Sequence, residues 1–481
     1  MTFDHTILAT ADGQGFRSVR HASTTREERF ALGRSLQQTV PHASLATWQA
    51  NSWRFDPLEL IAMSHAGRVP ELIGLRVGRM ASSPYGFLRG AAVVMAADVA
   101  SLPSTGIRPV ICGDAHLGNF GFYRSPEGEQ VIDLNDFDEA HPGSWEWDLR
   151  RVTASIHAAG RENGYTEQAC AEAVRTCVRA YRDEVASLAT QPLLARSFNR
   201  LGVAELHASV TEKTLKDEIK RAAKLARKRT SDRALPKLTG EKGGQRHIIL
   251  NPPVITAVTP EEYEAAAAAL DGYLATLPPH WRRVVAGYTL VDIAHKVVGV
   301  GSVGLRAYVA LLVGSSPDDV LFLQLKEARR SVLARFVHGN DAWHTHQGQR
   351  VVEYQQALQT VSDPLLGWTE FLGRQYYVRQ FRNMKGTVPL NAMTATALAD
   401  YSGIVGHLLA KGHARTSGAS MIAGYLGDSD GVADAMAEFA RRYADQTEAD
   451  HAQLVNAARR GLLPISPGAL ESMGSAFRPG G

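Results

Sequence analysis

The chain has 481 residues, 44% of them hydrophobic and 21% charged, and its 52 basic and 49 acidic side chains leave a formal net charge of +3. This composition is that of an ordinary globular chain with room for about three units, and it excludes a disordered or fibrous protein. Because three cysteines are too few for a disulfide framework, and neither a secretory signal nor an uninterrupted apolar stretch is evident, we expect a cytoplasmic protein that does not cross a membrane.

Residues from about 25 to 100 carry small and apolar side chains at helical spacing and show no active-site chemistry. The next block has a different character. A short strand at 108–112 leads into a turn rich in Gly and Asp, a second strand ends at Ile132, an acidic turn follows, and a helix begins near Trp147. Turns held by such a scaffold often carry catalytic residues, so this block is the candidate catalytic region.

Asp114 and Asn119 stand five residues apart on the first of these turns. In phosphoryl transfer an Asp orients and deprotonates the acceptor hydroxyl, while an Asn holds Mg²⁺ on the nucleotide. Asp136 follows Asn119 by seventeen residues, again after a strand, and a hard divalent cation needs such a carboxylate. Asp138 could supply a second metal carboxylate, and Asp133 is the alternative if the loop assignment is shifted by three residues.

The segments 112–119 and 133–139 resemble the catalytic and metal-binding loops of the aminoglycoside and choline phosphotransferase branch of the protein-kinase-like superfamily. There the pattern is His-Gly-Asp-x-x-x-x-Asn, followed by a strand, an Asp-Phe or Asp-Trp pair, and a helix that opens with Asp-Leu or Asp-Ile. The resemblance implies that Asp114 is the catalytic Asp, and that Asn119 and Asp136 are metal ligands.

Two further features bear on the resemblance. Asp148 and Leu149 match the expected helix start, whereas Cys112 departs from the usual His. The strings Cys-Gly-Asp-Ala-His-Leu-Gly-Asn-Phe-Gly and Asn-Asp-Phe-Asp-Glu also resemble a bacterial family catalogued as domain of unknown function 2252, over about residues 30 to 460. That second resemblance implies no activity.

The run from Lys213 to Lys237 is strongly basic. Its charges spread around a helix and no aromatic residues are interleaved with them, although stacking aromatics are typical of sites that bind single-stranded nucleic acid. We therefore expect a solvated helix face and no nucleic-acid partner.

A kinase also needs a glycine-rich loop over the phosphates and a strand lysine that reaches them. No lysine precedes Lys213, so the conventional order, with both parts ahead of the catalytic Asp, would need an arginine in place of that lysine. An arginine is a poor substitute for a compact ammonium in a tight phosphate pocket. The missing parts occur downstream. A glycine turn between two strand-like runs offers Gly299, Gly301, Ser302 and Gly304 to cover the phosphates, and Lys326 follows on a further strand.

A lysine in an apolar strand needs a carboxylate partner. The helix-like run that begins near Gln349 offers Glu353 for this role, with Glu327 and Glu370 as rivals. A strand at 376–381 then leads into the connection between lobes, where backbone groups would meet adenine.

Together these segments predict an α+β, protein-kinase-like fold of two lobes in circularly permuted order. Residues 1–240 would form a mainly helical catalytic part, residues 241–385 a β-rich nucleotide-binding lobe, and residues 386–481 helices that pack on the catalytic part. Lys326 should then reach the same nucleotide as Asp136.

The predicted activity is transfer of the γ-phosphoryl group of ATP, with Mg²⁺, to a hydroxyl of a small molecule. Asp114 would accept the proton, Asn119, Asp136 and Asp138 would hold Mg²⁺, and Lys326 would neutralise phosphate charge. The alternatives are AMP transfer on the same fold, phosphorylation of a protein hydroxyl, and a non-catalytic ATP-binding module.

Overall fold

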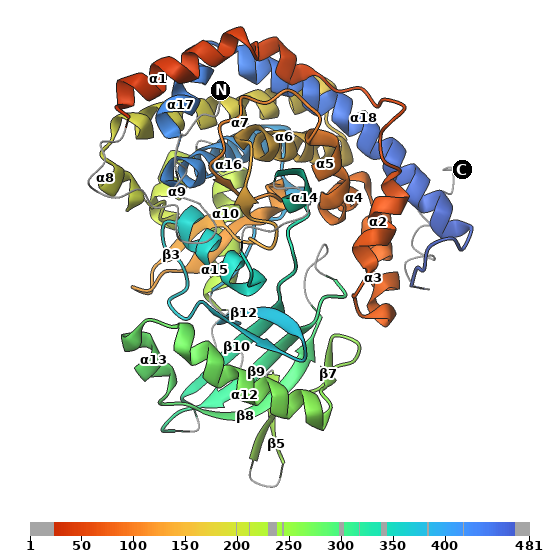
Figure 1. The fold of residues 1–481 in the computed structure, drawn as a ribbon, viewed down its shortest axis with the longest axis vertical. Helices are drawn as coiled ribbons and strands as arrows, with labels where there is room; N and C mark the ends of the chain where they lie inside the picture. The colour runs from red at the N-terminus through yellow and green to blue at the C-terminus, as the bar shows by residue number, and fades with distance from the viewer. Residues whose placement is uncertain are drawn as a thin grey trace.

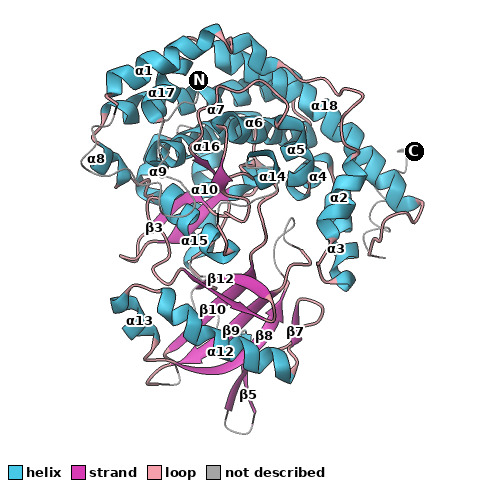
Figure 2. Ribbon diagram, viewed as in Figure 1, coloured by secondary structure: helices cyan, strands magenta, loops and turns pink. Residues whose placement is uncertain are grey.

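The structure is a computed structural model that describes residues 24–466, apart from 199, 211, 229–237, 243–244, 298–302, 317, 338–343, 382–383 and 417. Most helices gather in one part of the molecule, and a large β-sheet with further helices packed against it forms the other (Figure 1). Figure 2 shows the same division by type of secondary structure. This mixture of helix and strand confirms the predicted α+β class.

The chain begins with helices, as predicted. They are α1 (Arg26–Ser35), α2 (Pro57–His65), α3 (Pro70–Ala81), α4 (Pro84–Gly90) and α5 (Ala92–Val99), with 3₁₀ turns η1 (Leu36–Gln38) and η2 (His42–Ala46) after α1. The sequence marks their starts. Asp56 accepts a hydrogen bond from the backbone N–H of Leu58 before α2, Ser83 caps α4 in the same way, and a proline opens each of these two helices.

The predicted strand, turn, strand, turn and helix are all present. They comprise β1 (Val110–Ile111), η3 (Leu117–Asn119), β2 (Phe120–Arg124), β3 (Gln130–Leu134), β4 (His141–Pro142) and α6 (Trp145–Glu162). Strand β1 pairs antiparallel with β4, and β2 pairs antiparallel with β3. These short buried strands therefore hold the loops 112–119 and 135–140 against each other.

Four more helices follow before the sheet: α7 (Glu167–Thr190), α8 (Leu193–Ser197), α9 (Val203–Ser209) and α10 (Lys213–Arg227). The basic run falls on α10 and on the residues after it, of which 229–237 lie outside the described part. Leu215 and Ile219 of α10 are buried, whereas Lys220 and Lys224 are exposed. The described part of the run is therefore a solvated helix face, as predicted.

The large sheet has six antiparallel strands in the order β11-β12-β10-β9-β8-β7. Their bounds are β7 (Ile255–Ala257), β8 (Thr289–Lys296), β9 (Ala307–Val313), β10 (Val320–Glu327), β11 (Gly367–Phe371) and β12 (Arg374–Gln380). The associated elements are β5 (Thr239–Lys242), β6 (Gln245–Ile248), α12 (Pro260–Thr276), α13 (Pro279–Val285), α14 (Ala334–Val337) and α15 (Gln347–Leu358). Lys326 lies near the end of the central strand β10, opposite Ala307 of β9 and Tyr377 of β12.

After the sheet and the turn η4 (Leu390–Ala392) come three helices: α16 (Ala395–Thr416), α17 (Ala419–Leu426) and α18 (Gly431–Arg459). They do not form a unit of their own. Helix α16 packs on α7, α17 on α1, and α18 on α6 and α7, so the blue helices of Figure 1 lie among the red and yellow ones. One hydrophobic core accordingly combines buried residues from Leu36 to Ala440. A second core lies between α12 and the large sheet. No helix in the described ranges is long and apolar enough to cross a bilayer.

The contact between α7 and α16 supplies a test of this arrangement. A side chain at Gly406 would collide with the backbone oxygen of Cys177, whereas at Gly403 the nearest atom would be the Cγ2 of Thr176, 3.3 Å away. We expect Gly406→Ala to lower the free energy of unfolding by about 1–3 kcal/mol, because the two helix backbones must move apart. Gly403→Ala should change it by less than about 1 kcal/mol, since the tighter contact is offset by better helix propensity. Chemical denaturation measures both, and equal effects would contradict the packing described.

Candidate active site

A carboxylate holds the backbone at the start of the loop 112–119. Asp148, in the first turn of α6, accepts hydrogen bonds from the backbone N–H groups of Cys112 (2.7 Å) and Gly113 (2.8 Å). His413 of α16 lies 3.2 Å from the same carboxylate. Gly113 has a φ of +74°, and a side chain there would collide with the backbone oxygen of Glu139. The two loops therefore approach too closely for any residue but glycine at this point.

Asn119 joins the two loops. Its amide nitrogen donates to the backbone oxygens of Asp114 (3.1 Å) and Asp136 (3.0 Å), and its Oδ1 accepts from the backbone N–H of Asp136 (2.7 Å). The residue is only 3% exposed. The spacing that singled out Asn119 and Asp136 thus corresponds to a direct structural link, which fixes Asp114 and Asp136 relative to each other.

Asp114 is held by Arg151, a residue that the sequence analysis missed. The Nε of Arg151 lies 2.6 Å from Oδ1 of Asp114, and its NH2 group also donates to the backbone oxygen of Leu88 (2.8 Å). Burial raises the pKa of Asp114 to about 7, although the positive charge of Arg151 opposes this rise. The only signal in the sequence is that Arg151 follows Asp148 by three residues, about one turn along α6.

Lys326 contacts the loop at 135–140, called the acidic loop below, although it is 190 residues away from Asp136 in the chain. Its Nζ lies 2.5 Å from Oδ2 of Asp138 and 3.5 Å from Oδ1 of Asp136. The hydroxyl of Tyr377 donates to Oδ1 of Asp138 at 3.0 Å. The structure therefore brings together the lysine and the carboxylates that were predicted to share one site.

The charges in this cluster act on one another. Burial opposes ionisation of Asp136, but Lys326 and Arg379 outweigh it and lower the pKa of Asp136 to about 2. Burial and the charge of Asp136 raise the pKa of Asp138. Burial would lower the pKa of Lys326, yet the two carboxylates raise it above its ordinary value. Asp136 and Lys326 are thus both charged at neutral pH.

Arg350 of α15, also missed by the sequence analysis, connects the sheet to the acidic loop. Its guanidinium donates to the backbone oxygens of Ala140 (2.5 Å), Asp138 (2.7 Å) and Arg329 (2.8 Å). The side chain is fully buried. It fixes the backbone around Asp138 to the segment that follows β10.

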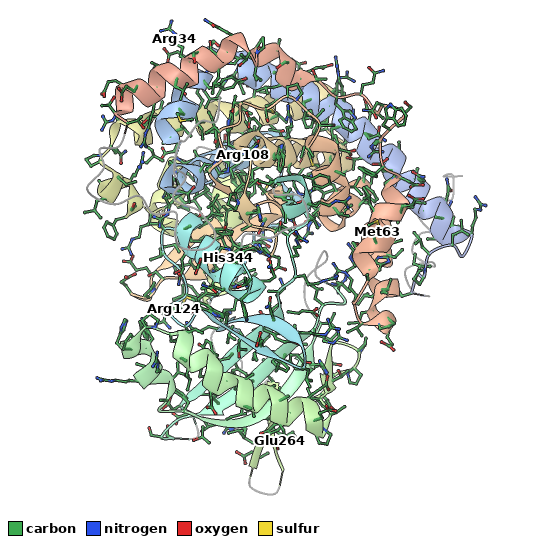
Figure 3. The ribbon with its side chains drawn as sticks, viewed as in Figure 1. Arg34, Met63, Arg108, Arg124, Glu264 and His344 are labelled. Atoms are coloured by element: carbon green, nitrogen blue, oxygen red, sulfur yellow. The ribbon has the colours of Figure 1, made fainter. Side chains whose placement is uncertain are left out.

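The structure does not bring Glu353 to Lys326, which corrects the predicted ion pair. The carboxylate of Glu353 instead contacts His344 (2.6 Å) and Gln349 (2.7 Å). His344 is labelled in Figure 3, where it lies beside α15. The reason is that α15 turns Arg350 toward the acidic loop, while Glu353 stays exposed and the nearby Asp136 and Asp138 satisfy the lysine.

Neither rival glutamate pairs with the lysine. Glu327 binds Arg374 at 2.9 Å and accepts from the backbone N–H of Arg306 at 3.0 Å. Glu370 is exposed on β11. All three glutamates therefore lie outside the ion pairs of Lys326.

Three of the four predicted loop residues, Gly299, Gly301 and Ser302, lie outside the described part of the chain. Gly304 is described, with a φ of +87°, and its carbonyl accepts from the backbone N–H of Val69 at 2.8 Å. The connection between α2 and α3 thus contacts the end of this glycine segment.

A cavity of about 370 Å³ lies between the helical part and the sheet, and Asp114, Asn119, Asp136 and Asp138 line it. Its walls carry five carboxylates: Asp114, Asp136, Asp138, Glu139 and Glu327. They also carry seven basic side chains: Arg68, Arg76, Arg89, Arg329, Arg330, Arg379 and Lys385. The sequence analysis missed this basic lining because its members come from segments far apart in the chain.

Comparison with known proteins gives one match. A family model described as "Uncharacterized protein conserved in bacteria (DUF2252)" matches residues 68–457. No curated protein and no solved structure matches the chain. The matched range contains every residue that lines the cavity except Ser64.

The contact between Lys326 and the acidic loop can be tested through stability. Lys326→Met leaves two carboxylates without their cation, and we expect the free energy of unfolding at pH 7 to fall by about 2 kcal/mol; this is less than for a fully buried pair, since the Asp136 side chain is 45% exposed. In the wild type the low pKa of Asp136 contributes stability above about pH 4, and this contribution is lost as the pH falls toward 2. The difference in the free energy of unfolding between the wild type and Lys326→Met should therefore become smaller as the pH falls from 7 to 3. Denaturant titrations at several pH values measure it.

The matched control is Lys224→Met, at an exposed position of α10, which should change stability by less than about 0.5 kcal/mol. A gap for Lys326→Met that is no larger than this, or that does not depend on pH, would show that the ion pair contributes nothing.

Proposed function

The chain belongs to the bacterial DUF2252 family, and we propose that it is a phosphotransferase that uses ATP and Mg²⁺ to phosphorylate a hydroxyl of a small molecule. One observation carries the proposal. Lys326 from the sheet contacts Asp136 and Asp138 at the cavity that Asp114 and Asn119 also line. These are the residue types that phosphoryl transfer requires: a base, metal ligands and a phosphate-binding lysine.

The order of the strands supports a protein-kinase-like fold. Strands β8, β9 and β10 are consecutive and antiparallel, the glycine segment joins the first to the second, and Lys326 is on the third. In protein kinases a glycine-rich loop covers the phosphates and the lysine is on the third strand. Here the catalytic loops precede this lobe in the chain, so we propose a circular permutation with parts at 1–240, 241–385 and 386–481.

The residues at the acidic loop fit a magnesium ion. In the described part of the chain no three His, Cys, Asp or Glu side chains are arranged to hold a metal by themselves. Mg²⁺ does not need such a set, because it is usually bound by one or two carboxylates together with substrate phosphates and water. Asp136 is ionised at neutral pH, Asp138 lies beside it, and Oδ1 of Asn119 retains a lone pair after accepting from the backbone. The bound ion would neutralise charge on the phosphates.

The basic residues whose charges act most strongly on Asp136 suit the phosphates of ATP. Lys326, Arg379 and Lys385 are the cations that most lower the pKa of Asp136. All three come from the sheet or from the segment after it. We propose that they hold the phosphates, that Gly299, Gly301, Ser302 and Gly304 cover them, and that the connection after β12 meets adenine.

Asp114 is suited to act as the base. A general base works best when its pKa is near the working pH, and burial raises the pKa of Asp114 to about 7. Arg151 holds Oδ1, which leaves Oδ2 for the acceptor hydroxyl. The proton passes from this hydroxyl to Oδ2, the hydroxyl oxygen forms a bond to the γ-phosphorus, and the bond from that phosphorus to the bridging oxygen of ADP breaks.

Nucleotide binding tests the proposed site. We expect Mg²⁺ and ATP to raise the thermal stability of the wild type, by about 2.7 kcal/mol at a hundredfold excess over Kd. Asp136→Asn and Lys326→Met should lose this increase, because one removes a metal ligand and the other a phosphate partner. Asp114→Asn should keep it while lowering turnover by about 10²–10⁴-fold, since the base acts only in the chemical step.

Asp271→Asn, at an exposed position of α12, is the control and should behave as the wild type. Binding without turnover on any acceptor would favour a non-catalytic module, and transfer of α-labelled rather than γ-labelled phosphate would favour AMP transfer. If the wild type shows no binding, the proposal is wrong.

The pH dependence of turnover tests the role of Asp114. Because the base must be deprotonated, activity should rise with pH through about 7. Arg151→Gln removes the positive charge that lowers the pKa of Asp114. The midpoint of the rise in activity should therefore move to a pH about one unit or more higher. Arg161→Gln, on the same helix but paired at the surface with Glu167, should leave the profile unchanged. An unshifted profile in Arg151→Gln would exclude Asp114 as the titrating base.

A further inference from the structure

Five arginines form a second basic surface in the cavity, separate from the residues assigned to the nucleotide. We call it the arginine wall, and it consists of Arg68, Arg76, Arg89, Arg329 and Arg330. Three of them come from α3, α4 and the connection before α3, and two from the segment after β10. The wall is therefore built largely from helices that precede the catalytic loop.

Backbone oxygens fix two members of the wall in place. Arg68 donates to the carbonyls of Ser64 (2.9 Å) and Val303 (2.6 Å), and Arg329 donates to that of Ala66 (2.7 Å). Within the described residues neither arginine forms an ion pair with a carboxylate. Their guanidinium groups are thus positioned, but no salt bridge balances their charge.

The arginines repel one another. Burial and the nearby charge of Arg329 lower the pKa of Arg68 to about 10, although the carboxylates of Glu139, Asp138 and Glu327 oppose this. Burial and the charges of Arg68 and Arg329 lower the pKa of Arg76 to about 9. The Nε of Arg89 is buried, and no group in the described ranges accepts a hydrogen bond from it. Bringing these positive charges together costs free energy, and a bound anion would offset their repulsion.

One end of the wall lies close to the proposed base, because Arg89 follows Leu88, whose backbone oxygen accepts a hydrogen bond from the Arg151 that holds Asp114. Lys326 and Arg379 act on Asp136, the proposed metal ligand. The other end of the wall, Arg68, donates to the backbone oxygen of Val303 beside the glycine segment, and the charges of Glu139 and Asp138 act on it. The charge of Arg89 lowers the pKa of His116, which lines the cavity two residues after Asp114. The arginines of the wall are thus additional to the three basic residues assigned to the nucleotide phosphates, and the wall extends to the proposed base.

We propose that the acceptor is a small molecule that carries a phosphate or carboxylate group besides its hydroxyl, and that Arg68, Arg89 and Arg329 bind this anionic group. The assignment of the anion as acceptor rests on the proposed phosphotransferase function. Arginine suits the task because its planar fork of donors matches both groups. Cationic acceptors such as aminoglycosides or choline would be repelled by the same wall.

The test is binding of inorganic phosphate, and of acetate in a parallel arm, to the full chain by calorimetry. Each is measured alone and after saturation with Mg²⁺ and a non-hydrolysable ATP analogue. We expect one of the two anions to bind in the presence of the analogue, and the arm that binds identifies phosphate or carboxylate as the recognised group. Arg68→Gln and Arg329→Gln should each weaken this binding by about tenfold or more, because a charged hydrogen-bond partner is lost. In Arg329→Gln, which does not touch the glycine segment, the analogue should bind within about twofold of the wild type.

Two further variants keep the test decisive. Arg330→Gln changes an exposed member of the wall, where misfolding is not expected, and should weaken anion binding about two- to threefold. Arg34→Gln is the control, since Arg34 lies on the outer surface of α1, far from the cavity (Figure 3), and should change nothing.

Three outcomes would overturn the inference. They are no binding of either anion, binding that the arginine variants leave unchanged, and displacement of the anion by the ATP analogue, which would assign the wall to the nucleotide. Failure of the proposed phosphotransferase function can be distinguished from failure of this inference. In the former case the ATP analogue itself would not bind to the wild type.

Discussion

The site depends on a lysine that the fold removes from water. Lys326 is 2% exposed, and a buried ammonium is tolerated only when carboxylates surround it, which here are Asp136 and Asp138. The lysine belongs to the sheet and the carboxylates to a loop of the helical part. This contact therefore helps to fix the two parts relative to each other beside the cavity.

The candidate catalytic loops, 112–119 and 135–140, are positioned mainly through their backbones. Asp148 holds the amides of the first loop, Asn119 links it to the second, and Arg350 fixes the second to the segment after β10. Because these partners come from α6, η3 and α15, a shift in any of these elements would move Asp114 or Asp136. The two carboxylates consequently have fixed positions. Their surroundings also separate them, because burial raises the pKa of Asp114 to about 7, while burial of Asp136 is outweighed by the charges of Lys326 and Arg379, which lower its pKa to about 2.

The remaining helices complete the site in two different ways. Helices α16 and α18 pack on α6 and α7, so they complete the core that supports the candidate catalytic loops. The early helices α2 to α4 instead reach the glycine segment through Val69 and Gly304 and supply arginines to the cavity. In the proposed permuted arrangement, the nucleotide lobe is thus inserted between two sets of helices that share one core.

The sequence by itself determined the α+β class, the strand and turn block around Asp114 and Asn119, the acidic loop, and the strand that carries Lys326. It could do so because hydrophobic periodicity and turn residues act over a few neighbouring positions. Only the tertiary structure decided that Lys326 pairs with Asp136 and Asp138 and not with Glu353, and that distant arginines line one cavity. Such contacts join residues far apart in the chain, and packing of whole elements, which no local pattern encodes, sets which charges meet.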